Sequence, residues 1–356
     1  MSESTNSLAQ MNLAQTRQWL ELLLAGESLQ ESDAAAVMMS LTDPNHPPAL
    51  AGALLGALRA KGVTAAELRG FAGAMRSLAR RLNLSKTKLQ QAIDIVGTGG
   101  DASGSFNLST GAALLAAACG QPVTKHGNRS ISSRSGSADV LESLGLSLPL
   151  DEQTASECLD ALNFTFFFAP YYHPAMKAIA PVRQALGVRT IFNVLGPLTN
   201  PANPPFLLVG AYSAEMARLM ADALSGMPQL VRAFVIHGAQ GWDEPTPIGS
   251  FQLFDVRPGS VQASQRDPLE VGLSRCTAED LRGGEATHNA EAMCEVFAGR
   301  GVSAHADALV LGAGLALECT GRVADWQAGI ALARATIAEG RALALVDRMR
   351  EFGARG

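Results

Sequence analysis

A glycine-rich run, GTGGD at 97–101, follows a short apolar segment and precedes a polar stretch that contains Ser109 and Thr110. Glycines after a buried strand let backbone N–H groups approach a phosphate, because no Cβ stands in the way. The first turn of a following helix adds unpaired N–H groups, and the hydroxyls of Ser109 and Thr110 could bind a phosphate or a metal there. The run indicates an anion-binding loop, although a tight turn with ordinary hydroxyl caps also fits it.

The same run matches the pattern G-x-G-x-x-A, which is typical of dinucleotide-binding folds. That use needs an acidic residue at the end of the second strand, where it binds the ribose hydroxyls. The sequence has KHGNR (125–129) at that place. We therefore do not expect a nicotinamide dinucleotide.

A second polar cluster, KHGNRSISS at 125–133, combines two fixed cations with an amide and several hydroxyls. A solvated loop rarely concentrates so many donors beside a glycine, so the cluster favours a polyanion site. His126 is its weakest member, because a histidine here could simply pack or form a structural hydrogen bond. Farther on, Ser137 is expected to cap a helix whose exposed N–H groups could take another phosphate. Asp139 and Glu142 are expected to stabilise the first turn of that helix.

Two adjacent carboxylates, Asp243 and Glu244, follow a third apolar segment at 231–237. Adjacent carboxylates in a loop suit Mg²⁺, which takes few protein carboxylates and completes its shell with phosphate oxygens. Viewed alone, the pair fits a solvated acidic turn equally well.

The elements that must position these clusters fall into two classes. Residues 13–82 show only helical patterns, at 15–24, at 33–41, after Pro47-Pro48, and from a capping box at Thr64 and Glu67 to about 81. From 93 onward strand-like segments alternate with helical ones, which predicts a mostly parallel sheet with ligand loops at the strand ends. Residues 251–261 alternate around Pro258-Gly259 and predict a hairpin.

Composition excludes several functions. The net charge of −5 gives no electrostatic attraction for nucleic acid or an anionic membrane. No apolar run reaches membrane-spanning length, and residues 1–12 lack the features of a signal peptide. The five cysteines have no metal-binding spacing, which favours reduced thiols in a cytoplasmic protein.

Five segments, in the same order and over nearly the whole chain, resemble the anthranilate phosphoribosyltransferase family. They are DIVGTGGD (94–101), FNLST (106–110), KHGNRSISSRSGSADVLESLG (125–145), HPAMKAIAPVRQALGVRTIFNVLGPLTNPA (173–202) and DLRGGEATHNA (280–290). The resemblance implies transfer of phosphoribosyl from phosphoribosyl pyrophosphate (PRPP) to the amine of anthranilate, with Mg²⁺ and release of pyrophosphate, in tryptophan biosynthesis.

The resemblance also implies a nucleoside phosphorylase/phosphoribosyltransferase-like α/β fold with a small all-α N-terminal domain. That domain would comprise residues 1–85 and the helix at 172–188, and the PRPP-binding domain would comprise 90–170 and 190–356. The active site would lie at the hinge between them, and two copies would form a homodimer through the helical domains.

The resemblance assigns roles to individual residues. Asn128 and Arg183 would bind the aromatic acid, and Ser109, Asp243 and Glu244 would hold Mg²⁺. Lys125, Asp243 and Glu244 would carry the catalysis. The residues expected to bind the substrates are Gly97, Gly100, Asp101, Ser105, Asn107, Leu108, Ser109, Thr110, Lys125, His126, Gly127, Asn128, Arg129, Ser130, Ile131, Ser132, Ser133, Ser137 and Arg183.

Three other functions fit part of the pattern. A family member that acts on another aromatic amine or benzoate differs only in its substrate. A pyrimidine nucleoside phosphorylase shares the architecture and the S-x-S-G-x-x-D-x-L-E pattern at 133–142, but Arg183 and the full KHGNR run argue against it. A non-catalytic binding protein, for example for nucleic acid, disagrees with the acidic net charge.

Overall fold

A computed structural model gives the structure of the protein and describes residues 2–101, 103–130 and 134–355, with side chains from residue 13 onward. The chain divides into two compact units, Met1–Arg80 with Tyr172–Thr199, and Arg81–Tyr171 with Asn200–Gly356. Within the described ranges, no helix has both the length and the apolar character needed to span a membrane.

The first unit is built from helices. They are α1 (Ser2–Leu24), α2 (Glu31–Leu41), α3 (Pro48–Lys61), α4 (Ala65–Ser77), α10 (Met176–Leu186), α11 (Phe192–Leu195) and the 3₁₀ helix η1 (Gly196–Leu198). The predicted capping box at the start of α4 is confirmed: the N–H of Glu67 donates to the Thr64 hydroxyl (3.2 Å), and the N–H of Thr64 donates to the Glu67 carboxylate (2.8 Å). α4 ends before the expected residue 81, because the N–H of Arg80 donates to the carbonyl of Tyr172 (2.9 Å).

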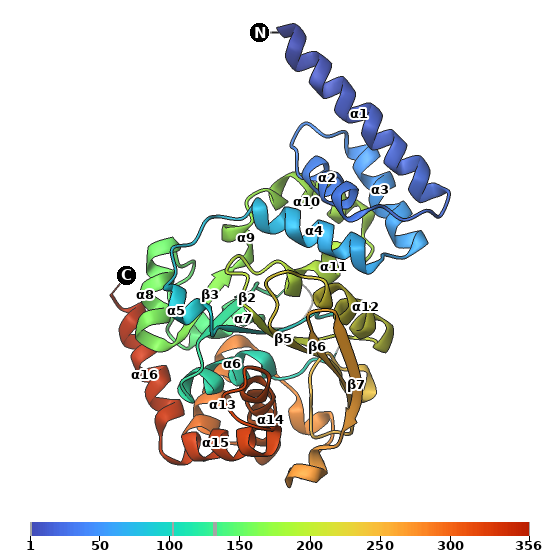
Figure 1. Ribbon diagram of the computed structural model, residues 1–356. Coiled ribbons are helices and arrows are strands. Elements are labelled where there is room, and N and C mark those ends of the chain that lie inside the picture. The colour runs from blue at the N-terminus through green and yellow to red at the C-terminus, as the bar shows by residue number, and fades with distance from the viewer. Residues whose placement is uncertain (1, 102, 131–133, 356) are drawn as a thin grey trace. The chain divides into compact units, whose positions relative to one another are not determined.

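Among the described residues, the strands of the second unit form one seven-stranded sheet in the order β3-β2-β1-β4-β5-β6-β7. Figure 1 labels β2, β3, β5, β6 and β7 of this sheet. The strands are β1 (Ile93–Gly97), β2 (Val123–Gly127), β3 (Phe164–Phe168), β4 (Phe206–Gly210), β5 (Arg232–His237), β6 (Phe251–Arg257) and β7 (Ser260–Arg266). β1 to β5 pair in parallel, while β6 and β7 pair antiparallel. The predicted mostly parallel sheet and the predicted hairpin at Pro258-Gly259 are confirmed.

Helices connect the parallel strands. α6 (Leu108–Ala118) links β1 to β2, and α12 (Ala214–Ser225) links β4 to β5. These two right-handed connections run in opposite directions along the sheet, which places α6 and α12 on opposite faces. The other helices of the unit are α5 (Lys86–Leu89), α7 (Ser137–Ser143), α8 (Glu152–Leu162), α13 (Ala286–Phe297), α14 (Ser303–Cys319), α15 (Trp326–Ala338), α16 (Arg341–Gly353), η2 (Ala239–Gly241), η3 (Pro268–Val271) and η4 (Glu279–Leu281), and α9 (Ala169–Tyr172) ends at the boundary of the units.

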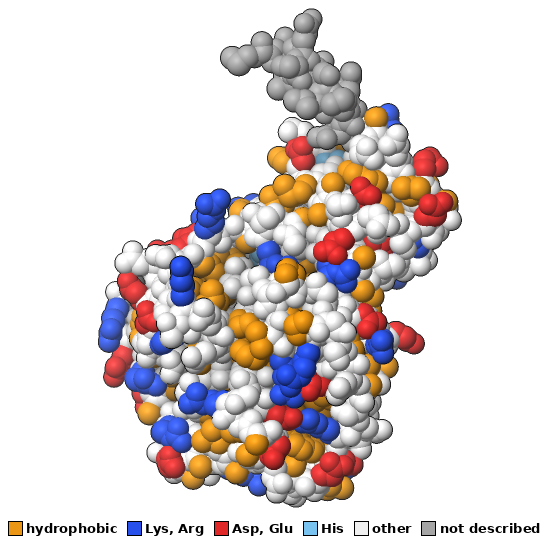
Figure 2. Space-filling view, in the orientation of Figure 1, with side chains coloured by type: hydrophobic (Ala, Val, Ile, Leu, Met, Phe, Trp, Pro, Cys, Tyr) orange, Lys and Arg blue, Asp and Glu red, His pale blue; other side chains and the backbone are white. Residues whose placement is uncertain are grey.

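The parallel strands β1 to β5 are buried along most of their length, whereas β7 is largely exposed. α6 has the sequence LSTGAALLAAA, which is apolar on all sides, and it packs between the sheet and α14. On the face shown in Figure 2, Lys and Arg side chains are interspersed with Asp and Glu side chains, in agreement with the small net charge.

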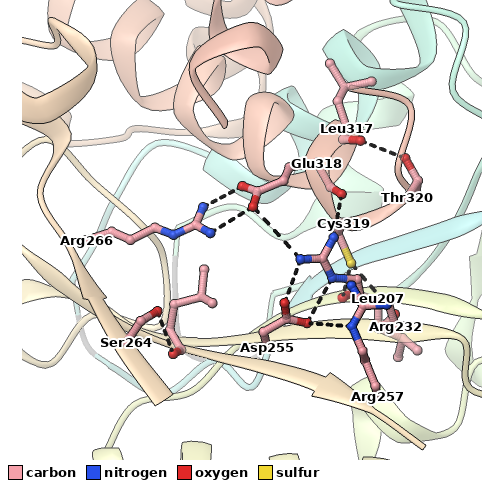
Figure 3. A network of polar contacts seen from close by, with 11 residues as sticks. Leu207, Arg232, Asp255, Arg257, Ser264, Arg266, Leu317, Glu318, Cys319 and Thr320 are labelled. Atoms are coloured by element: carbon pink, nitrogen blue, oxygen red, sulfur yellow. Dashed lines mark hydrogen bonds and ion pairs between the residues drawn. The ribbon is translucent and has the colours of Figure 1, made fainter. Parts of the chain in front are cut away.

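Charged side chains join the antiparallel strands to the end of α14 (Figure 3). The two terminal guanidinium nitrogens of Arg266 donate to the Glu318 carboxylate, at 2.5 and 2.8 Å, and Glu318 is buried. Arg232 on β5 donates to Asp255 on β6 (2.9 and 2.6 Å) and to the carbonyl of Glu318 (3.0 Å). The network fixes β5 and β6 against α14, and β5 leads directly to the loop that carries Asp243 and Glu244.

We predict that Glu318→Ala destabilises the protein by roughly 2–3 kcal/mol and lowers its thermal midpoint by several degrees, because Arg266 loses its bidentate partner in a poorly solvated position. Glu339→Ala is the matched control: its partner Arg341 is exposed, so the midpoint should hardly change. Calorimetric melting of both variants measures the effect, and equal midpoints would show that the network contributes nothing.

Candidate active site

The order of the strands reverses direction between β1 and β4. From β1 the chain continues outward to β2 and β3, whereas from β4 it continues to β5 on the other side. In open α/β sheets, ligands bind beyond the carboxyl ends of the strands at such a switch point. Here these ends are Gly97 and Gly210, which face each other in the β1–β4 register. The GTGGD run therefore begins at the position that the topology favours for a ligand.

Asp243 packs directly over these two strand ends. A Cβ added to Gly97 would lie 2.3 Å from Oδ2 of Asp243, and a Cβ added to Gly210 would lie 1.5 Å from its carbonyl oxygen. Only glycine leaves room for this approach. Oδ2 of Asp243 accepts a hydrogen bond from the N–H of Gly99 (2.6 Å), and the N–H of Asp243 donates to Asp101 (3.4 Å).

Glu244 takes the neighbouring position at the start of α6. Its Oε1 accepts a hydrogen bond from the N–H of Ser109 (3.2 Å). Asn107 is the N-cap residue of α6, but its side chain makes no cap bond to its own helix. The helix start and the glycine loop thus each present an N–H group, and in this structure both groups are bonded to carboxylates.

Burial and mutual repulsion change the acidity of the pair. Burial, followed by the charges of Glu244 and Asp101, raises the pKa of Asp243 well above its usual value. Burial raises the pKa of Glu244 to about 7, although the charge of Lys125 opposes the rise. Negative charge is therefore crowded at this edge of the sheet, and a bound cation would relieve the crowding.

The two carboxylates fit a magnesium ion that also binds substrate oxygens. Within the described residues, no group of three or more His, Cys, Asp or Glu side chains is placed to hold a metal. Mg²⁺ commonly uses one or two protein carboxylates and completes its shell with water and phosphate oxygens. Asp243 and Glu244 would supply two such ligands, and the hydroxyl of Ser109 lies at the helix start that Glu244 contacts.

Lys125 lies behind this site, with 2% of its surface exposed. Its ammonium group donates to the carbonyl of Ile95 (2.5 Å) and to the hydroxyl of Ser109 (3.3 Å). Burial lowers its pKa, while the charges of Asp94 and Glu244 raise it. The structure thus places the cation expected to catalyse the reaction beneath the hydroxyl of Ser109.

The expectations for the loop after β2 need two corrections, of which the first is that Glu142 lies near the end of α7 (Ser137–Ser143) and not in its first turn. Ser137 does not cap α7, because Gly136 is the N-cap residue and the Ser137 hydroxyl donates to the carbonyl of Asn128 (3.2 Å). Asp139 accepts from the N–H groups of Gly136 (2.9 Å) and Ser130 (3.1 Å), so it stabilises both the first turn, as expected, and the loop before it.

Arg129 is exposed and ion-paired. Its guanidinium bonds to Asp139 (2.9 Å) and, through two nitrogens, to Glu142 (2.5 and 2.7 Å). Both carboxylate partners belong to α7, so the expected binding of a polyanion by Arg129 must compete with these ion pairs.

The remaining expected residues of the second unit lie around the same strand ends. Asp101 accepts from the N–H and hydroxyl of Ser103 (3.1 and 3.0 Å), and the Ser103 hydroxyl donates to Ser105 (3.2 Å). His126 is buried, and its backbone N–H donates to Asp94 (3.3 Å). Gly100 and Asn128 are exposed, Gly127, Asn107 and Ser130 are partly buried, and Leu108 and Thr110 are buried. Ile131, Ser132 and Ser133 lie outside the described residues.

Sequence reasoning missed two buried polar residues, Asp94 and Asn200. The Asn200 amide donates to Asp94 (2.8 Å) and to the carbonyl of Thr124 (2.6 Å), so it links β1 to β2 behind the loops. Both residues stand in quoted segments, and a charged residue inside the otherwise apolar strand IDIVG was the available signal. Burial raises the pKa of Asp94 to about 6.

Arg183 belongs to the first unit, on α10. Its guanidinium lies over the ring of Phe192, 4.9 Å from the ring centre, and burial lowers its pKa. None of the carboxylates in the described part of the chain forms an ion pair with it. A partly buried guanidinium beside an aromatic ring suits a planar aromatic acid.

Comparisons with known proteins identify the family of this chain. The model of the glycosyl transferase family a/b domain matches residues 89–343, and that of the glycosyl transferase family helical bundle domain matches residues 17–79. An anthranilate phosphoribosyltransferase from Desulforudis audaxviator is 44% identical over 339 residues, which cover 95% of this chain and 96% of that protein. One from a Shewanella species is 41% identical over 331 residues, which cover 93% and 95%.

Solved structures give the same result. The anthranilate phosphoribosyltransferase of Thermus thermophilus superposes with a TM-score of 0.87 at 41% identity, covering 94% of this chain and 99% of that one. The enzyme of Saccharomyces cerevisiae in complex with PRPP and Mg gives a TM-score of 0.85 at 25% identity, covering 96% and 99%. The extent of these matches shows that the chain belongs to the anthranilate phosphoribosyltransferase family.

Proposed function

We propose that this protein transfers the phosphoribosyl group of PRPP to anthranilate in tryptophan biosynthesis. The amino nitrogen of anthranilate forms a bond to the anomeric carbon, the bond from that carbon to pyrophosphate breaks, and the nitrogen loses a proton. The main support for this proposal is that the N–H groups of Gly99 and Ser109 meet two carboxylates, those of Asp243 and Glu244, at the switch point of the sheet.

The two N–H groups and the start of α6 form a cradle for phosphate oxygens. Asp243 and Glu244 accept hydrogen bonds from these two N–H groups, as phosphate oxygens would. The same two carboxylates would hold a magnesium ion, and the two N–H groups would then bind the phosphates of PRPP. Bound magnesium supplies positive charge that offsets the charge on departing pyrophosphate.

Positioning and charge neutralisation carry most of the proposed catalysis. The nitrogen of an aromatic amine is unprotonated at pH 7, so its attack needs no strong base. The ammonium group of Lys125 lies behind the cradle and donates a hydrogen bond to the Ser109 hydroxyl (3.3 Å). The other substrate-binding residues expected from the sequence remain part of this proposal.

Arg183 is proposed to bind the carboxylate of anthranilate. The support is its planar guanidinium, stacked on Phe192 and without an ion-pair partner among the described residues. A carboxylate can accept two parallel hydrogen bonds from this group. The relative from Saccharomyces cerevisiae has been solved with 4-fluoroanthranilate, an aromatic acid of the same type.

We also propose that the protein forms a homodimer in the cytoplasm. The helices of the first unit expose large apolar side chains, among them Leu24 (64%) and Met39 (47%), which a second copy would cover. The five cysteines are free thiols, in agreement with a reducing compartment.

The assay that tests the proposed function measures pyrophosphate release from PRPP and Mg²⁺ with a panel of amines. The panel contains anthranilate, its 3- and 4-amino isomers, and aniline. We expect anthranilate to be turned over with the highest kcat/KM, because only it places the amine beside a carboxylate. Faster turnover of another member would assign a different substrate, and phosphorolysis of a pyrimidine nucleoside without pyrophosphate release would refute the reaction itself.

We predict that Arg183→Ala raises the KM for anthranilate about ten- to a hundredfold, because a charged bidentate contact is lost. The KM for PRPP should change much less. Arg183→Lys should restore part of the affinity, since it keeps the charge and loses the planar fork. Arg69→Ala, which removes an arginine paired with Glu31 in the same unit, serves as the control. A wild-type KM for anthranilate in Arg183→Ala would exclude this role.

A further inference from the structure

The segment DLRGGEATHNA (280–290) contains none of the proposed substrate ligands, although it contacts the anion-binding loop. The N–H of Phe106 donates to the carbonyl of Leu281 (2.9 Å), and the N–H of Gly283 donates to the carbonyl of Gly104 (2.9 Å). A Cβ on Gly283 would lie 2.6 Å from the carbonyl oxygen of Ser105. The segment therefore runs directly alongside residues 104–106 as a short antiparallel pairing.

Asn289, at the end of this segment, has 1% of its surface exposed and uses its whole side-chain amide. Its Oδ1 accepts from the N–H of Gly284 (2.7 Å), and its Nδ2 donates to the carbonyl of Gly284 (3.2 Å). A backbone N–H can only donate and a carbonyl can only accept, so these two bonds fix which atom of the amide is nitrogen. The second hydrogen on Nδ2 donates to Oδ1 of Asn107 (2.7 Å).

The orientation of Asn107 follows from that of Asn289. Because Nδ2 of Asn289 must donate, the atom of Asn107 that meets it must be the oxygen. The nitrogen of Asn107 then lies on the other side, where it donates one hydrogen to the carbonyl of Ser135 (3.2 Å). That nitrogen carries a second hydrogen, and Asn107 is partly exposed.

The same bond changes what Asn107 does at the start of α6. An asparagine at an N-cap position usually accepts hydrogen bonds from N–H groups in the first turn of its own helix. Here Oδ1 accepts hydrogen bonds from Nδ2 of Asn289 (2.7 Å) and from the hydroxyl of Ser135 (3.4 Å) and makes no such bond. The N–H groups of the first turn thus stay available to another acceptor, as the bond from Ser109 to Glu244 shows.

We infer that Asn289 is a positioning residue, which turns the amide of Asn107 so that its nitrogen donates to an oxygen of PRPP and its oxygen does not cap α6. The inference rests on the proposed function, since it takes Asn107 as a PRPP ligand. Two hydrogen bonds of 2.7 Å support it: one joins the N–H of Gly284 to Asn289, and the other joins Asn289 to Asn107.

Asn289→Asp tests the inference with little change of shape. An aspartate still accepts from the N–H of Gly284, but it presents an oxygen to Asn107, whose amide must then reverse. We expect the Kd for PRPP with Mg²⁺, measured by calorimetry on the full chain, to rise at least about tenfold, and the KM for anthranilate to change less than about twofold. Asn289→Ala removes the donor without adding charge and should raise the Kd for PRPP about three- to tenfold.

Two controls separate the possible outcomes. Asn163→Asp adds the same charge directly before β3, at the amino ends of the strands, whereas the proposed site lies at their carboxyl ends. This variant should bind PRPP like wild type. Asn107→Ala should weaken PRPP binding; if it does not, the proposed ligand role of Asn107 is wrong. If Asn107→Ala weakens binding while both Asn289 variants bind normally, the positioning role is wrong. An equal loss of kcat and of both affinities, with a lowered thermal midpoint, would show that Asn289 is only structural.

Discussion

Two carboxylates, the buried Asp243 and the partly buried Glu244, accept hydrogen bonds from two backbone N–H groups and organise the second unit at the carboxyl ends of its central strands. Asp243 and Glu244 reach the N–H groups of Gly99 and Ser109 from a loop more than a hundred residues away in the sequence. Each feature nearby serves this approach: glycine at both strand ends leaves space for Asp243, and the network around Glu318 fixes the strand that leads to the loop.

The charges at this edge are balanced only in part. Asp94 and Glu244 lie near the buried ammonium group of Lys125, whereas Asp243 lies near the carboxylates of Glu244 and Asp101, and burial raises the pKa of Asp94, Asp243 and Glu244. A divalent cation and a polyanion bound together suit such a site better than either alone, because the cation satisfies the carboxylates and the anion takes the released N–H groups. This reciprocal need accounts physically for a reaction that uses PRPP with Mg²⁺.

Local sequence signals predicted the features that depend on neighbours in the chain. The capping box at Thr64, the alternation of strands and helices, and the hairpin at Pro258-Gly259 could all be read from short patterns. Features that depend on distant partners could not be predicted: α4 stops where Arg80 bonds to Tyr172, Arg129 is taken by Asp139 and Glu142, and Asn200 finds Asp94 across 106 residues. The Ser137 cap failed because Gly136 already occupies the cap position.

Binding calorimetry of PRPP, with Mg²⁺ and with the metal chelated, tests most directly whether Asp243 and Glu244 couple the binding of PRPP to that of Mg²⁺. We predict that chelation weakens PRPP binding to the wild-type chain at least about a hundredfold, a difference of roughly 2.7 kcal/mol. In Asp243→Asn with Glu244→Gln, the metal should make little difference. Equal affinity of the wild-type chain with and without Mg²⁺, or a full metal response in the double variant, would contradict this account.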